Sequence, residues 1–246
     1  MATVAIYSLK GGVGKTTLTI NLAWASAMRS ARRTLLWDLD PQAASTFLLG
    51  DGEAGRHPAQ SIFSKDVAAA KLICETAVDR LDLLPADSSL RQLDHLFHAL
   101  DKKKRLSKLL ADLTRDYDRI LLDCPPGLTE TSEQVMRAAD LIVVPVVPSP
   151  LSQRAFEDVA THLAQRGAKV PLLPVHAMVD RRRKLHAEAL AQHPDWPVIP
   201  MASIIESVAV QRAPVGAFAP RSAGARAFND AWQVVERTLG GAPARP

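Results

Sequence analysis

The stretch Tyr7-Ser8-Leu9-Lys10-Gly11-Gly12-Val13-Gly14-Lys15-Thr16-Thr17 decides most of what this sequence predicts about its fold. It follows a short apolar segment, Thr3-Val4-Ala5-Ile6, with the composition of a buried strand. After it, apolar residues recur at helical spacing, at Leu18, Leu22, Ala25 and Met28. A strand, a glycine-rich loop and a helix in this order are the context in which such a loop binds phosphate.

The chemistry of the loop fits an anion. Glycines lack a Cβ, so the backbone can turn tightly and point its N–H groups at phosphate, and the following helix adds its positive end. Lys15 would add charge for the terminal phosphates, and the hydroxyl of Thr16 would bind Mg²⁺. The alternative is a glycine-rich turn that binds nothing. The expected phosphate-binding residues are Gly11, Gly12, Val13, Gly14, Lys15, Thr16 and Thr17.

Two further segments each consist of an apolar, strand-like run that ends in acidic residues. They are Thr34-Leu35-Leu36-Trp37-Asp38-Leu39-Asp40-Pro41-Gln42 and Ile120-Leu121-Leu122-Asp123-Cys124-Pro125-Pro126. Ligands of open parallel sheets sit at the carboxyl ends of strands, so we expect these acids beside the loop. Taken singly, Asp38 could be a helix N-cap and Asp123 a plain strand-end acid.

Together the three segments resemble a known family. Lys-Gly-Gly-Val-Gly-Lys-Thr-Thr is similar to the deviant Walker A loop of the ParA/MinD family of ATPases, in which an extra lysine, here Lys10, reaches the partner's ATP in a homodimer. Asp-Leu-Asp-Pro-Gln and Leu-Asp-Cys-Pro-Pro resemble its second motif and its Walker B. The resemblance implies that Lys10, Lys15 and Asp40 are catalytic, with Asp40 orienting the attacking water. It implies that Asp38 supports the Mg²⁺ shell and Asp123 holds a Mg²⁺-bound water.

The resemblance continues more weakly toward the end of the chain. Met178-Val179-Asp180-Arg181 and Ile199-Pro200 are similar to family segments near the adenine, so Met178 and Pro200 are expected there. The chain has no Asn-Lys-x-Asp or Thr-Lys-x-Asp segment for guanine, which favours ATP. It departs from the family at Leu9, where a polar residue is usual, and at Gly127, where serine is common.

The pattern of elements predicts an α/β fold. We expect a doubly wound, mostly parallel twisted sheet with helices on both faces, as a single domain over residues 1–240 with a frayed tail over 241–246. The expected strands are 2–8, 33–39, 81–84, 118–123, 140–146, 170–177 and 197–200. The expected helices are 15–29, 89–99, 102–115, 130–139, 151–166, 182–192 and 222–239.

Composition argues against a membrane-spanning, secreted or disulfide-rich protein. Hydrophobic residues make up 47% of the 246, enough for a sizeable core. No apolar run reaches the roughly 18 residues that span a bilayer, and the first strand leaves no room for a signal peptide. We read Cys74 and Cys124 as buried free thiols, with neither a disulfide framework nor an iron–sulfur cluster. These observations predict a cytoplasmic protein.

The resemblance, rather than the small net charge, implies a nucleic-acid partner. The net charge is +4, and the family resemblance favours non-specific DNA binding on the nucleoid, with surface charge as the alternative. The candidate contacts are Arg181, Arg182, Arg183, Lys184, Arg212, Arg221 and Arg226. The run Lys102-Lys103-Lys104-Arg105 is expected to serve solubility. The last helix has one apolar face, which a core-facing helix explains, so no membrane partner is expected.

The sequence therefore predicts a ParA-like ATPase whose Mg²⁺-ATP-dependent dimer binds DNA and positions a plasmid, a chromosome or a large protein assembly. The resemblance also implies an adaptor of the ParB type that stimulates hydrolysis. Two alternatives stay open. One is a regulator of a secretion or polysaccharide machine that acts through protein contacts without DNA. The other is a metabolic ligase or synthetase.

Overall fold

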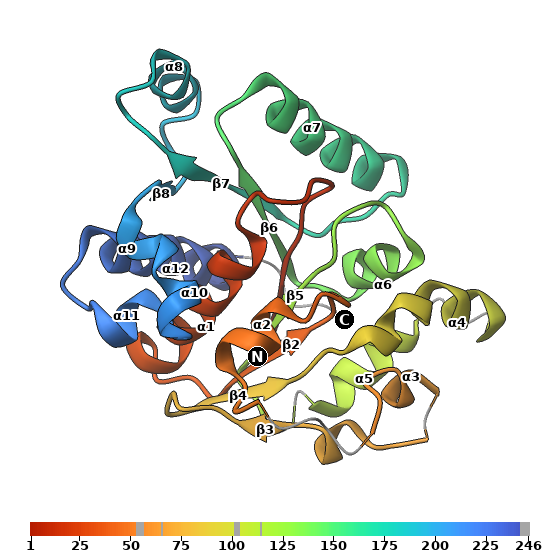
Figure 1. The fold of residues 1–246 in the computed structure, drawn as a ribbon. Helices are drawn as coiled ribbons and strands as arrows, with labels where there is room; N and C mark the ends of the chain where they lie inside the picture. The colour runs from red at the N-terminus through yellow and green to blue at the C-terminus, as the bar shows by residue number, and fades with distance from the viewer. Residues whose placement is uncertain (53–56, 65, 101–103, 114, 242–246) are drawn as a thin grey trace.

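The computed structural model describes residues 1–52, 57–64, 66–100, 104–113 and 115–241 (Figure 1). The strands are β1 (Ala2–Ile6), β2 (Thr34–Asp38), β3 (Cys74–Glu75), β4 (Leu81–Leu84), β5 (Arg119–Asp123), β6 (Leu141–Val146), β7 (Leu172–Val179) and β8 (Val198–Pro200). The longer helices are α1 (Lys15–Arg29), α4 (Leu93–Leu100), α5 (Arg105–Leu113), α6 (Glu130–Ala138), α7 (Pro150–Gln165), α8 (Lys184–Gln192) and α12 (Ala223–Gly241). Short helices in the connections are α2 (Ala44–Leu49), α3 (Ser61–Ser64), α9 (Ser203–Glu206), α10 (Val208–Gln211) and α11 (Val215–Phe218), with 3₁₀ turns at Ala69–Lys71 and Ser88–Gln92.

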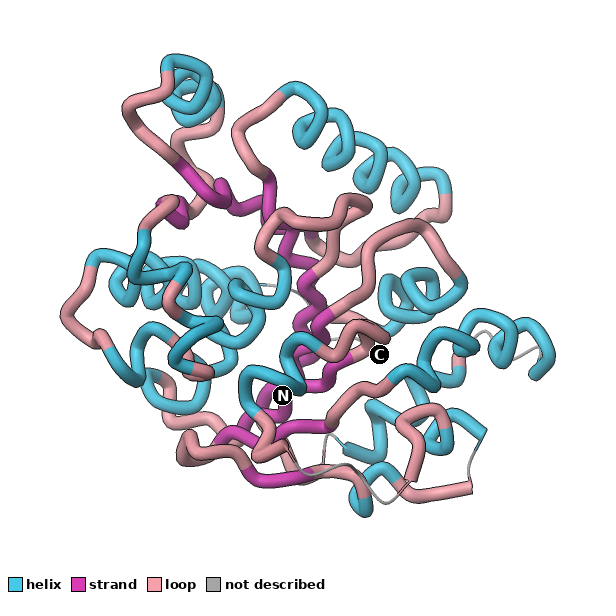
Figure 2. The backbone as a smooth tube through the Cα atoms, in the orientation of Figure 1, coloured by secondary structure: helices cyan, strands magenta, loops and turns pink. Residues whose placement is uncertain are grey.

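The described strands form one sheet in the order β3-β4-β2-β5-β1-β6-β7-β8. Figure 2 shows these strands running through the middle of the molecule between two groups of helices. Every neighbouring pair is parallel except β3 and β4, which are antiparallel. Parallel neighbours need crossover connections, and helices supply them here. The predicted doubly wound, mostly parallel sheet is confirmed.

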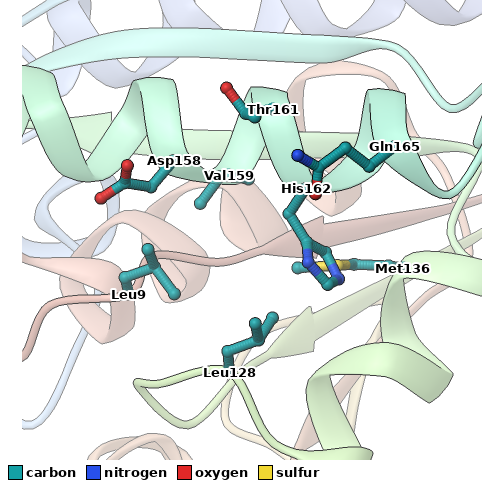
Figure 3. A pocket seen from close by; sticks show the side chains of 8 residues that line it. All are labelled: Leu9, Leu128, Met136, Asp158, Val159, Thr161, His162 and Gln165. Atoms are coloured by element: carbon teal, nitrogen blue, oxygen red, sulfur yellow. The ribbon is translucent and has the colours of Figure 1, made fainter.

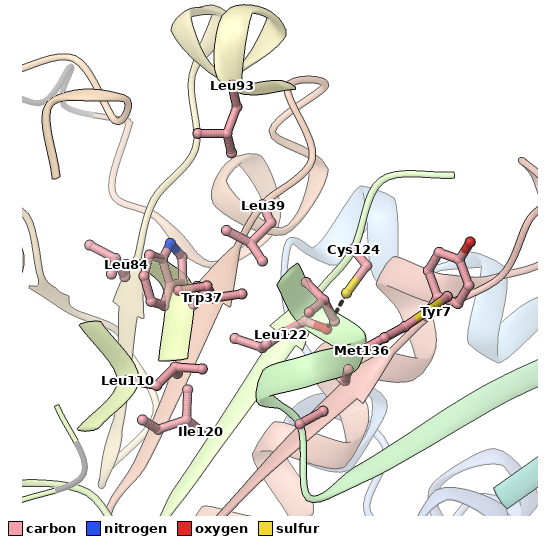
Figure 4. Close-up of a cluster of buried hydrophobic side chains, with 14 of the residues drawn as sticks. Tyr7, Trp37, Leu39, Leu84, Leu93, Leu110, Ile120, Leu122, Cys124 and Met136 are labelled. Carbon is pink, nitrogen blue, oxygen red and sulfur yellow. Dashed lines mark hydrogen bonds between the residues drawn. The ribbon is translucent and has the colours of Figure 1, made fainter. Parts of the chain in front are cut away.

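Each face of the sheet packs against its own hydrophobic layer. Successive side chains of a strand point to opposite faces, so Leu35 and Trp37 of β2 join one layer and Leu36 joins the other. The first layer includes residues from α3 to α7, and Figure 4 shows part of it around Trp37 and Leu122. The second layer includes residues from α1, α2 and α12. Burial on both faces explains why these strands are continuously apolar.

The structure differs from the predicted elements mainly at short segments. The strand β3 and the short helices α2, α3 and α9 to α11 are absent from the prediction, because each is too short to show a period. The strand expected over 170–177 runs over Leu172–Val179 instead. The last helix continues to Gly241, so Gly240 and Gly241 do not end it where expected. The rest of the predicted tail, residues 242–246, lies outside the described residues.

The expectation for the run at 102–105 is wrong at its last residue. Arg105 is buried, and its Nε and Nη2 donate to the carbonyl oxygens of Phe63 and Ile62 at 2.8 and 3.0 Å. Arg105 therefore ties α5 to α3, and does not serve solubility. Lys102 and Lys103 lie outside the described residues.

Among the residues that the structure describes, no helix has the length and apolar character needed to cross a membrane.

Candidate functional site

The glycine-rich loop connects β1 to α1 at the carboxyl edge of the sheet. Gly12 and Gly14 have φ angles of 71° and 87°, a region that favours glycine. Gly14 is also the N-cap of α1, and a Cβ there would lie 3.3 Å from the Cε atom of Met178. A side chain at this position is therefore both strained and crowded. The loop ends where Lys15 begins the helix, as the sequence predicts.

Lys15 is buried at the base of the loop. Its side-chain Nζ donates to the carbonyl oxygen of Lys10 at 3.1 Å. Burial lowers the pKa of Lys15, while the negative charges of Asp123 and Asp40 raise it. A buried ammonium costs free energy unless an anion faces it, so this position suits an anionic ligand.

Asp38 and Asp123 stand side by side at the ends of neighbouring strands. They are register partners in the β2–β5 pair, and both are buried. Asp38 accepts hydrogen bonds from the Thr46 N–H, the Thr46 hydroxyl and the Asp40 N–H at 2.9, 2.7 and 3.1 Å. Asp123 accepts from the hydroxyls of Ser45 and Thr19 at 2.7 and 3.3 Å.

Burial raises the pKa of both carboxyl groups. For Asp38 the charge of Asp123 raises it further. For Asp123, hydrogen bonds from the side chains of Ser45 and Thr16 oppose the effect of burial, and the charge of Asp40 adds to it. The structure thus brings Lys15, Thr16 and the three predicted acids together at one edge of the sheet. Two buried acids on paired strands favour a cation beside them.

Ser45 and Thr46 are site residues that sequence reasoning missed. Both lie on α2, directly after the segment Asp38-Leu39-Asp40-Pro41-Gln42, and the Thr46 hydroxyl also accepts from the Ala86 N–H at 2.8 Å. The only available signal was a Ser-Thr pair following a strand-end acid. Because α2 has six residues, no helical period marks it.

A small cavity of about 160 Å³ adjoins the loop on the side of β7 and β8. The predicted residues Met178 and Pro200 line it together with Val13 and Gly14, and Met178 has a φ angle of 54°. Several further lining residues, among them Met201, Ile205 and Glu206, were not predicted. A flat apolar group bound next to the phosphate loop would fit this position.

Leu9, the unusual residue before Lys10, lines a second cavity, which contains none of these acids. This cavity has a volume of about 210 Å³, and Leu9 lines it together with Leu128 and with Val159 and His162 of α7 (Figure 3). Leu9 packs against the hydrophobic layer on that face of the sheet. This packing gives a structural reason for an apolar residue at the position.

The predicted DNA contacts are exposed but do not form one cluster. Arg181, Arg182, Arg183 and Lys184 lie at the start of α8, whereas Arg212, Arg221 and Arg226 lie at α10 and α12, and Figure 1 shows α8 apart from these helices. Helix α8 begins at Lys184, so the start expected at residue 182 is wrong. Arg182 is paired with Asp180 through contacts of 2.9 and 3.0 Å.

The raised carboxyl pKa values predict a pH dependence. A carboxyl whose folded pKa exceeds its unfolded value takes up a proton on folding, so stability falls as pH rises between the two values. Burial raises the pKa of Asp38 to about 7 and that of Asp123 to about 6. We therefore expect the melting temperature of the nucleotide-free protein to fall between about pH 4 and about pH 7, and Asp123→Asn to flatten this slope.

Scanning calorimetry across this pH range measures the effect. Asp180→Asn serves as the control, because the pKa of Asp180 is lowered to about 2 by its hydrogen bonds with Arg182. Asp180→Asn should leave the slope between about pH 4 and about pH 7 unchanged. Equal slopes for the wild type and Asp123→Asn would contradict the expectation.

Comparisons with known proteins agree with this geometry. Residues 1–171 match the family described as AAA domain. The chain is 32% identical over 180 residues to a virulence plasmid ParA family protein of Chlamydia psittaci, covering 71% of this chain and 68% of the relative. It is 28% identical over 241 residues to the sporulation initiation inhibitor protein Soj of Bacillus subtilis, covering 92% and 95%.

Its fold also resembles a solved structure. The septum site-determining protein MinD of Pyrococcus horikoshii, complexed with Mg-ADP, matches with a TM-score of 0.79 at 23% identity over 99% of each chain. The phosphate loop, the paired strand-end acids and these similarities lead to one conclusion. The chain belongs to the ParA/MinD family of P-loop ATPases.

Proposed function

We propose that this protein is an ATPase that works as a dimerisation switch, in which Mg²⁺-ATP closes two copies and slow hydrolysis releases them. The observation that carries the proposal is the buried Lys15 ammonium, which lies at a glycine-rich loop beside two buried acids. Family membership and the Mg-ADP of the MinD neighbour support it.

The residues present fit a magnesium nucleotide. The backbone at Gly12 and Gly14 has left-handed φ angles that favour glycine, and a Cβ at Gly14 would crowd Met178 at the neighbouring cavity. Among the described residues, the Lys15 ammonium has only a loop carbonyl as its hydrogen-bond acceptor. The donor set of hydroxyl and carboxylate oxygens at Thr16, Asp38 and Asp123 is the chemistry that Mg²⁺ prefers. When bound, Mg²⁺ would screen the charge on the phosphates.

Each residue then has a distinct task. The N–H groups from Gly11 to Thr17 bind the phosphates, and Lys15 neutralises charge that develops at the terminal one. Thr16 would contribute its hydroxyl to the metal, Asp38 would support the metal's shell, and Asp123 would hold a water molecule bound to it. Asp40 orients the attacking water, and the cavity lined by Met178 and Pro200 holds the adenine.

Lys10 gives the switch its dependence on a second copy. Among the described residues, its side-chain ammonium forms no hydrogen bond or ion pair, while its backbone supports Lys15. A flexible cation next to the phosphate site is available to the partner's triphosphate. The dimer is then stable only while the γ-phosphate is present, and hydrolysis shifts the population to monomers.

The ATP dimer would bind DNA without sequence preference and position a cargo through an adaptor of the ParB type. The exposed arginines of the described surface supply cations for phosphates, which is all that such binding needs. The name of one relative, a virulence plasmid ParA family protein, supports a partitioning role.

A mobility assay with long DNA tests the binding. We expect retention of DNA in Mg²⁺-ATP and its loss in Mg²⁺-ADP. Reversing Arg221 and Arg226 to Glu should weaken retention about tenfold or more at low salt, because each lost contact removes a phosphate neutralisation and a new acid repels DNA. Arg181→Glu with Arg183→Glu tests the α8 group separately. Dimers that form in ATP but leave DNA untouched would instead favour the regulator that acts through protein contacts.

A further inference from the structure

The short helix α2 carries the hydroxyl groups that hold the two buried acids. Ser45 donates to Asp123 at 2.7 Å, and Thr46 donates to Asp38 through both its N–H and its hydroxyl. Helix α2 has only six residues, and its N-cap, Ala43, provides no side-chain hydrogen bond. An isolated helix of this length is unstable in water, so α2 depends on contacts from other parts of the chain.

Arg212 makes such contacts at the C-terminal end of α2. Its Nε donates to the carbonyl oxygen of Phe47 at 2.9 Å, and its Nη2 donates to that of Gly50 at 2.8 Å. Its guanidinium carbon lies 4.8 Å from the centroid of the Phe47 ring, which is 60% exposed. The last carbonyls of a helix have no partner within it, and a cation beside them is favourable. Arg212 therefore stabilises the end of α2 by hydrogen bonds, charge and ring contact together.

The segment around Arg212 is itself fixed on α1. The Val215 N–H donates to the side-chain oxygen of Asn21 at 2.8 Å. Gly216 lies so close to Trp24 that a Cβ there would come within 2.2 Å of the ring. Arg212 adopts a left-handed backbone with a φ angle of 45°, at the end of α10. The arginine thus connects α2 to the helix that follows the phosphate loop.

We infer that Arg212 is a positioning residue, which supports α2 and thereby holds Ser45 and Thr46 against Asp123 and Asp38. The inference rests on the proposed function for what these acids do, but the contacts to α2 exist without any ligand. Two donors of the guanidinium are used inside the protein. Its loss should therefore have effects in the absence of DNA, unlike that of a residue that only contacts DNA.

Hydrogen exchange of the nucleotide-free full chain tests the contact directly. In Arg212→Ala, amides over residues 44–49 should exchange about tenfold faster, because two hydrogen bonds from a charged donor are lost, while those in the middle of α12 keep their wild-type rates. In nucleotide titrations, half-saturation by Mg²⁺ should need about tenfold more metal. Affinity for ATP measured in EDTA should stay unchanged.

Matched variants separate positioning from a general effect of charge. Arg237→Ala removes the same charge from an exposed site on α12 and should behave as wild type. Arg212→Lys keeps one donor and the cation over Phe47, so it should recover part of the protection. If Arg212→Ala unfolds, Arg212→Lys and Phe47→Leu still test the contact, and each should show a smaller increase in exchange over residues 44–49.

Two outcomes would contradict the inference. Wild-type exchange over residues 44–49 in Arg212→Ala would overturn it, as would a variant that loses only DNA retention. A wild type that binds no nucleotide would contradict the proposed function, yet the exchange measurement would still decide whether Arg212 supports α2.

Discussion

Lys15→Ala is expected to abolish nucleotide binding, with a loss of affinity of about a hundredfold or more. The Lys15 ammonium is buried at the base of the loop and lies near Asp123 and Asp40. Without it, a triphosphate would meet these acids without the buried cation at the base of the loop. Losing one partner of a buried ion pair costs about 3–5 kcal/mol, and about 2.7 kcal/mol already corresponds to a hundredfold.

Calorimetric titration with Mg²⁺-ATP measures this loss. Lys169→Ala removes an exposed lysine and should bind as the wild type does. Because burial lowers the pKa of Lys15, its charged form costs free energy in the nucleotide-free protein, so Lys15→Ala should keep a cooperative thermal transition. Wild-type affinity in Lys15→Ala would exclude the loop as the phosphate site.

Lys10→Ala should have the opposite pattern, with nucleotide binding retained and ATP-dependent dimerisation lost. The side chain of Lys10 has no hydrogen bond or ion pair among the described residues, and the contact to Lys15 uses its backbone. The variant therefore keeps the loop and loses only the charge offered to the partner. We expect dimer affinity in Mg²⁺-ATP to fall about a hundredfold or more, as for other charge pairs across interfaces.

Light scattering in Mg²⁺-ATP, Mg²⁺-ADP and without nucleotide measures the effect. Lys15→Ala should also stay monomeric, because it binds no nucleotide. The binding titration therefore distinguishes the two variants, since only Lys10→Ala should still bind Mg²⁺-ATP. Lys10→Arg keeps the charge and should retain part of the dimer. A Lys10→Ala dimer as stable as that of the wild type would refute the role across the interface.

The central sheet was predictable from local sequence because its strands are buried on both faces. A continuously apolar run such as Ile120-Leu121-Leu122 is stable only where both faces of the strand are buried. The glycines before Lys15 indicate where the chain turns out of the first strand. Asp38 and Asp123 lie at the ends of β2 and β5 as predicted, since parallel strands bring their carboxyl ends to one edge. Asp40 lies two residues beyond the end of β2.

The parts that escaped prediction depend on distant contacts. The six residues of α2 are held by Asp38, Asp123 and Arg212, and none of these contacts follows a local period. Arg105 and Arg212 could not be predicted for the same reason. Both donate hydrogen bonds to backbone carbonyls of distant segments, and no local sequence pattern distinguishes such an arginine from an exposed one. A run of charged residues predicts an exposed segment, and only the packing shows which of its side chains binds within the protein.

The most direct test is a crystal structure of the protein with a non-hydrolysable ATP analogue and Mg²⁺. The account predicts a symmetric pair in which the Lys10 ammonium of each copy lies within hydrogen-bond distance, about 2.7–3.2 Å, of a phosphate oxygen bound by the other. A closed pair in which both Lys10 side chains extend into bulk solvent would contradict it.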